Sequence, residues 1–154
     1  MVDNIQVSIN RLLENWIKQG FGIFPATIEK IEKTQREKEV FLPEDFVKLY
    51  TVVNGMRTHY PDDMDEEGFF FYSVEQLIPC AGELKVPLTT ELDDVLIFAE
   101  YMHKSWWYGF KAQNGRNAYT IGLILDKDSF KPITDSLSEF IQFYLEDSPR
   151  LYPQ

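Results

Sequence analysis

The sequence predicts an α+β fold in which a central, mostly antiparallel sheet is flanked by N-terminal helices and a C-terminal helix. Two observations carry this prediction. Apolar residues recur at helical spacing before residue 54 and again near the C-terminus, whereas the middle of the chain contains β-branched and aromatic runs bounded by turn residues. Helices that precede and follow a group of strands, rather than alternating with them, are typical of α+β proteins with an antiparallel sheet.

The first predicted helix begins at Ile5 and ends before Gly20. Its apolar residues share one stripe of an amphipathic helix: Ile5, Ile9, Leu12, Leu13, Trp16 and Ile17. After Pro25 a second, shorter stripe contains Ile28 and Ile31. The polar residues 34–39 that follow it are interpreted as a solvated end or loop, so the second helix is predicted to be short.

The third predicted helix begins at Pro43. Its apolar face consists of Phe46, Val47, Leu49, Tyr50 and Val53. Two acidic residues in the first turn suit the positive end of the helix dipole. The pair Asn54-Gly55 is interpreted as a left-handed stop at the C-terminal end of this helix.

Four segments are predicted to be strands, namely 69–72, 95–101, 106–112 and 119–125. Between the first two, we expect a short helical turn over 73–78 and an irregular connection over 79–91. Asn114-Gly115 accepts the positive φ angles of a hairpin turn and predicts that the last two strands pair. The terminal helix has an apolar stripe formed by Leu137, Phe140, Ile141, Tyr144 and Leu145, and Thr134 or Asp135 is its expected cap.

The chain has 154 residues, which predicts a single domain over 1–154. It carries 15 Lys and Arg against 25 Asp and Glu, a net charge of −10, so its surface repels nucleic acid and anionic lipid. Cys80 is the single cysteine and cannot form an intramolecular disulfide. No secretory leader pattern or membrane-length apolar run occurs, and we expect a soluble, cytoplasmic protein.

Motifs for catalysis and cofactor binding are absent from the sequence. There is no GxSxG, HExxH, GxGxxG or phosphate loop, and His59 and His103 are the two histidines, each explained equally well by a loop position or by packing. We therefore expect no catalytic residues, no cofactor and no enzymatic activity.

Acidic residues at alternate positions around Asp63, Asp65 and Glu67 invite comparison with a calcium-binding EF-hand loop. The twelfth position of that loop requires a bidentate Glu but contains Val74, and the residues before it favour a strand over a helix. We expect no metal site, and a solvated acidic loop is the simpler interpretation.

Three groups of residues are candidates for binding a protein partner. The first is an acidic loop with Asp62, Asp63, Asp65, Glu66 and Glu67, and the second is the acidic group Glu91, Asp93 and Asp94. The two would form one negative face if they lie on the same side of the sheet. The third group is Trp106 and Trp107, which face opposite sides of a strand, so that one is expected outside unless helices cover both faces.

The segment 42–55, with Leu42, Pro43, Phe46, Leu49, Asn54 and Gly55 in their expected places, resembles the SUKH superfamily. That superfamily includes fungal cell-wall assembly regulators and many bacterial immunity proteins. Pro25-Ala26, the aromatic strand at 69–72 and the segments 73–77 and 95–110 follow the family order, so the resemblance covers about residues 24–145. It implies an α+β fold with a mostly antiparallel sheet, no enzymatic activity and no catalytic residue to transfer.

The resemblance and the charge together lead to a first hypothesis, in which the protein is an immunity protein. It would bind and neutralise a cognate bacterial toxin, for example a nuclease, by docking its acidic surface over a basic cleft. The second hypothesis is a regulatory scaffold or adaptor for an endogenous protein partner, as the fungal relatives suggest. The third is a hydrolase without a known motif. The oligomeric state and the identity of the partner stay open.

Overall fold

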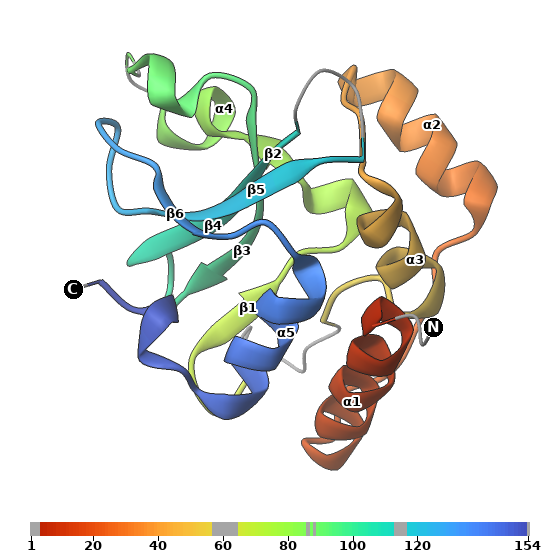
Figure 1. Ribbon diagram of the computed structural model, residues 1–154. Coiled ribbons are helices and arrows are strands. Elements are labelled where there is room, and N and C mark those ends of the chain that lie inside the picture. The colour runs from red at the N-terminus through yellow and green to blue at the C-terminus, as the bar shows by residue number, and fades with distance from the viewer. Residues whose placement is uncertain (1–3, 57–64, 86, 88, 113–116, 154) are drawn as a thin grey trace.

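The computed structural model describes residues 4–56, 65–85, 87, 89–112 and 117–153. The predicted turn at Asn114-Gly115, together with Asp62, Asp63 and His59, lies outside these residues. Over the described residues the chain forms one six-stranded sheet in which every pairing is antiparallel. With helices before and after the strands, the α+β prediction is confirmed (Figure 1).

The sheet has the order β1-β3-β4-β5-β6, and β2 pairs with the same edge of β3 as β1 does. The strands are β1 (Phe69–Phe71), β2 (Ile78–Pro79), β3 (Val95–Tyr101), β4 (Trp106–Ala112), β5 (Tyr119–Ile124) and β6 (Lys131–Thr134). The helices are α1 (Asn4–Lys18), α2 (Ile28–Lys38), α3 (Glu44–Val52), α4 (Cys80–Leu84) and α5 (Leu137–Glu146). Three 3₁₀ turns complete the chain, η1 (Val74–Gln76), η2 (Thr90–Leu92) and η3 (Pro149–Leu151).

The core lies between one face of the sheet and α1, α3 and α5. Phe46 of α3 is fully buried and stacks on Phe110 of β4, with ring centroids 4.1 Å apart. The Trp16 indole of α1 donates to the Tyr144 hydroxyl of α5 at 3.0 Å, and these two helices lie side by side in Figure 1. Each fully buried aromatic side chain contributes about 2–3 kcal/mol through the apolar area it removes from water.

The second helix is longer than predicted, because α2 continues through the polar residues to Lys38. Its N-cap Thr27 accepts from the Lys30 amide at 3.1 Å, and a left-handed Glu39 ends it. On its inner face Thr34 is buried and donates to the Lys30 carbonyl. Over its 11 residues α2 buries two, Ile31 and Thr34, and its polar composition concealed this narrow inner face.

Two further predictions about local structure are wrong. The terminal helix is capped by Ser136, whose side chain accepts from the Glu139 amide, and not by Thr134 or Asp135. Thr134 instead ends β6, a strand of four residues that contains Pro132 and therefore lacks a normal strand pattern. The connection over 79–91, predicted as irregular, contains the last residue of β2, all of α4 and the start of η2.

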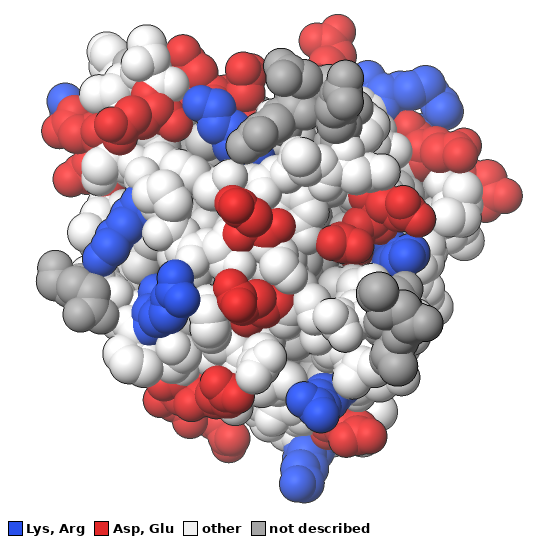
Figure 2. Space-filling model, viewed as in Figure 1, with Lys and Arg blue, Asp and Glu red and all other residues white. Residues whose placement is uncertain are grey.

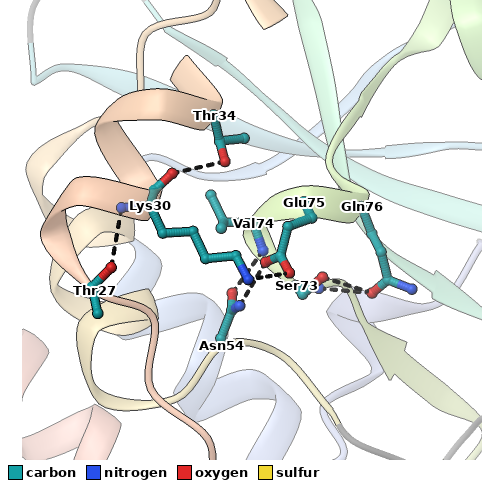
Figure 3. A network of polar contacts seen from close by, with 8 residues as sticks. All are labelled: Thr27, Lys30, Thr34, Asn54, Ser73, Val74, Glu75 and Gln76. Atoms are coloured by element: carbon teal, nitrogen blue, oxygen red, sulfur yellow. Dashed lines mark hydrogen bonds and ion pairs between the residues drawn. The ribbon is translucent and has the colours of Figure 1, made fainter. Parts of the chain in front are cut away.

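Asn54-Gly55 is not a left-handed helix stop. The residue after α3, Val53, is extended, and only Gly55 is left-handed, with φ +74°. Asn54 is 3% exposed, and its side-chain oxygen accepts from the Val74 amide at 2.7 Å while its side-chain nitrogen donates to Glu75 at 2.7 Å. The pair therefore joins the end of α3 to η1, twenty residues further along the chain (Figure 3).

A surface ion pair completes this network. Glu75 also contacts the Lys30 ammonium of α2 at 2.9 Å, so its carboxylate connects α2 with Asn54 (Figure 3). Burial alone would raise the pKa of Glu75, but hydrogen bonds from Lys30 and Asn54 outweigh burial and hold the pKa below its ordinary value. Next to it, Ser73 and Gln76 form a capping box that fixes η1.

Two left-handed glycines give a matched test of the close approach at Gly55. A Cβ on Gly55 would lie 2.5 Å from the Ser73 backbone nitrogen, whereas a Cβ on Gly20, with φ +90°, meets nothing within 4 Å. Gly20→Ala should cost about 1 kcal/mol of unfolding free energy through φ alone. Gly55→Ala should cost at least about 2 kcal/mol, because overpacking adds to that cost. Equal losses in urea denaturation would contradict the packing role of Gly55.

The lowered pKa of Glu75 predicts how stability depends on pH. A carboxylate whose folded pKa lies below its unfolded value stabilises the fold above the unfolded pKa, and this contribution disappears as the pH falls through the folded pKa. Glu75→Gln should therefore lose up to about 1 kcal/mol at pH 7 and little below pH 4. Glu14→Gln, which changes an exposed residue of α1, is the control. Denaturation curves in which the two variants keep the same difference from pH 7 to pH 3 would refute this.

Candidate protein-binding surface

Asp65 does not belong to an accessible acidic surface, contrary to the prediction. It is 5% exposed, and its carboxylate accepts from the amides of Glu67 and Phe69 at 2.9 and 2.8 Å and from the Tyr144 hydroxyl. Burial raises the pKa of Asp65, and its hydrogen bonds oppose that increase. The carboxylate is a structural group that fixes the start of β1 against α5.

The two accessible acidic groups lie at opposite ends of β3. Glu66 and Glu67 are exposed just before β1, whose Phe69 pairs with Tyr101, the last residue of β3. The second group, Glu91, Asp93 and Asp94, is exposed just before Val95, the first residue of β3. Six residue steps along a strand span about 20 Å. The groups are therefore separate, and Figure 2 shows acidic side chains spread over the visible face with Lys and Arg between them.

The second group is larger than the sequence indicated. The Thr89 amide and hydroxyl donate to the carbonyls of Lys127 and Asp128, both at 3.2 Å, and the Phe130 amide donates to the Glu91 carboxylate at 3.3 Å. These bonds join residues 89–94 to the loop between β5 and β6. We define the acidic cluster as the five exposed residues Glu91, Asp93, Asp94, Asp126 and Asp128.

Sequence reasoning missed Asp126 and Asp128 because the contact joins residues 39 apart. The one feature of the sequence that could have indicated this contact is a pair of glycines. Gly109 and Gly122 face each other on β4 and β5, and a Cβ on Gly122 would lie 2.6 Å from the Phe130 ring. Two facing glycines on adjacent strands indicate that another segment lies close over the sheet there.

Trp106 and Trp107 face opposite sides of the sheet, as alternation along β4 predicts. Trp106 stacks on Tyr101 with ring centroids 4.5 Å apart and donates to the Tyr108 hydroxyl at 2.9 Å. The Trp107 indole nitrogen is buried and has no hydrogen-bond acceptor among the described residues. Both side chains are half-buried, so neither is a fully exposed anchor.

A groove of about 660 Å³ opens next to the acidic cluster. Its walls come from the chain after α2, from the junction of β2 with α4, and from the adjoining ends of β3 and β4. Asp94 lines the groove and also belongs to the cluster, which makes the two features contiguous. Phe41, which sequence reasoning did not single out, is 44% exposed on the groove wall. The only sequence clue was its position between two helices, outside both apolar stripes.

Cys80 and His103 lie outside the acidic cluster. Burial raises the pKa of the Cys80 thiol to about 12, so it stays protonated at neutral pH. His103 is exposed in the turn between β3 and β4. Within the part of the chain that the structure describes, no three metal-ligating side chains are grouped, and no helix is long and apolar enough to cross a membrane.

Comparison with known proteins places this architecture in a family. Residues 25–142 match the model of the SMI1/KNR4 family (SUKH-1). The match begins at Pro25, includes the Asn54-Gly55 junction with η1, and extends into α5. A search of curated proteins finds no match. The matched region covers more than half of the chain and includes every strand, and the chain therefore belongs to the SMI1/KNR4 (SUKH-1) family.

Proposed function

We propose that this protein is an immunity protein that binds and neutralises a cognate toxin with a basic surface. Membership of the SUKH-1 family supports a protein-binding module of the immunity or regulatory kind. The observation that carries the finer proposal is the acidic cluster beside the groove. An apolar recess with a charged rim has the composition of a protein interface, where a desolvated centre provides affinity and the rim provides orientation.

Electrostatic attraction gives such a protein a physical route to fast inhibition. The chain carries a net charge of −10, and the acidic cluster brings five carboxylates together, of which Asp128 pairs with Lys127 at 3.2 Å. The negative electrostatic potential attracts a cationic partner to this surface and raises the association rate, most strongly at low salt. Covering a substrate cleft then blocks a toxin without any chemistry by the inhibitor.

The alternative is a regulatory scaffold that binds an endogenous protein, and the same surface would serve it. Co-expression with the product of a neighbouring toxin gene separates the two. Rescue of growth supports immunity. Binding to a housekeeping protein, with no rescue from the toxin, supports a scaffold.

Matched pairs of substitutions test which end of the sheet steers the partner. Asp93→Asn with Asp94→Asn should slow association with the basic partner by on the order of tenfold at low salt and flatten its salt dependence. Glu66→Gln with Glu67→Gln changes the charge by the same amount at the other end of β3 and should have a much smaller effect. Surface-binding kinetics at two salt concentrations measure both.

Two outcomes would contradict the assignment of the steering surface to the acidic cluster. If both pairs slow association equally, only the net charge matters. If the Glu66 and Glu67 pair alone slows it, the binding surface lies at the start of β1. Trp106→Ala and Trp107→Ala complete the series, because a tryptophan in the interface would mainly change the dissociation rate.

A further inference from the structure

We propose that the groove beside the acidic cluster holds an apolar side chain of the partner whose neighbouring residues are Arg or Lys. This inference rests on the proposed function and adds the chemistry of the segment that docks. The expected occupant is a polypeptide segment with an aliphatic or aromatic residue at its centre and a cationic residue on either side.

The floor of the groove is apolar and preformed. Val95, Leu96 and Phe110 line it and are at most 5% exposed, so sheet packing fixes their positions. Phe41, by contrast, exposes 44% of its surface on the wall. A large aromatic side chain left partly in water beside a volume of about 660 Å³ has unburied apolar area that an incoming side chain can cover.

The rim selects for positive charge. Glu39 and Asp94 line the groove from different segments, and both are left-handed, with φ of 54° and 62°. Among the described residues neither carboxylate has an ion-pair partner.

One cation also lines the groove, Lys38 at the end of α2. Two carboxylates and one ammonium give the rim a net negative charge. Glu91 and Asp93 of the acidic cluster lie just before Asp94 in the sequence. An acidic segment would meet like charges at the rim, whereas a basic segment would find two carboxylates without an ion-pair partner among the described residues next to the apolar floor. Charge complementarity therefore identifies the occupant as apolar at its centre and basic at its flanks.

Three short peptides test the centre and the flanks separately. The probes are acetyl-Arg-Phe-Arg-amide, acetyl-Arg-Ala-Arg-amide and acetyl-Glu-Phe-Glu-amide, titrated into the full-length ¹⁵N-labelled protein. The first should shift the amide signals of Val40, Leu96 and Ala112 and bind at least tenfold more tightly than the other two. Equal binding of the Ala peptide would refute the apolar centre, equal binding of the Glu peptide would refute the basic flanks, and no shift with any peptide would overturn the proposal.

Two surface variants with equal exposure locate the binding on the protein. Phe41→Ser should weaken the Arg-Phe-Arg peptide at least fivefold, and Leu125→Ser, at a residue that is also 44% exposed but outside the groove, should leave it unchanged. Unchanged binding by Phe41→Ser would contradict the groove as the site. Failure of this inference is distinguishable from failure of the proposed function, because rescue of growth on co-expression with the toxin does not require that the groove holds the toxin.

Discussion

The buried side-chain amide of Asn54 connects segments of the chain that lie next to the edge of the sheet, and the arrangement of that edge depends on this contact. It offers its oxygen to the Val74 amide and its nitrogen to Glu75, while its backbone amide donates to the Phe24 carbonyl. Three segments far apart in sequence therefore meet at one residue, and Figure 3 shows its side-chain contacts with Val74 and Glu75. Removing the side chain would leave the buried Val74 amide without a partner, which costs about 1–3 kcal/mol. Gly55 makes the meeting possible, because no Cβ fits between it and residues 72–73.

The position of η1 then determines how the edge of the sheet is built. β1 comes just before η1 and β2 just after it, and both pair with β3. Pro79 of β2 and Leu96 of β3, which pair in the sheet, both line the groove. Asn54, two residues after α3, therefore contacts the segment that leads into one wall of the groove, although no residue of α3 lines the groove.

Much of the fold could be predicted because its information is local. The apolar stripes of α1, α3 and α5 are periodic in sequence and most of their residues are buried, whereas β3, β4 and β5 are recognisable as β-branched and aromatic runs. The wrong predictions share a cause, because in each of them tertiary contacts outweigh the local sequence preference. α2 continues through polar residues because one face packs, and Asn54-Gly55 serves a segment twenty residues away rather than its own helix.

The candidate site was less predictable for the same reason. Asp65 has the same local sequence surroundings as Glu66, yet Tyr144 and two amides enclose its carboxylate. Asp126 and Asp128 join the acidic cluster only through bonds to the 89–94 segment. No pattern in the sequence shows which ends of strands meet around a groove, and Phe41 became a candidate only once its exposure beside that groove was known.

Amide hydrogen exchange in Asn54→Ala tests the organising role of this residue most directly. If Asn54 holds η1 and the adjoining sheet edge in place, the amides of Met56 and Tyr72, which donate to Phe71 and Phe98, should exchange about tenfold to a hundredfold faster. Amides of β4 and β5 should keep most of their protection. Unchanged exchange at Met56 and Tyr72 in the folded variant, or an equal increase throughout the sheet, would contradict the account.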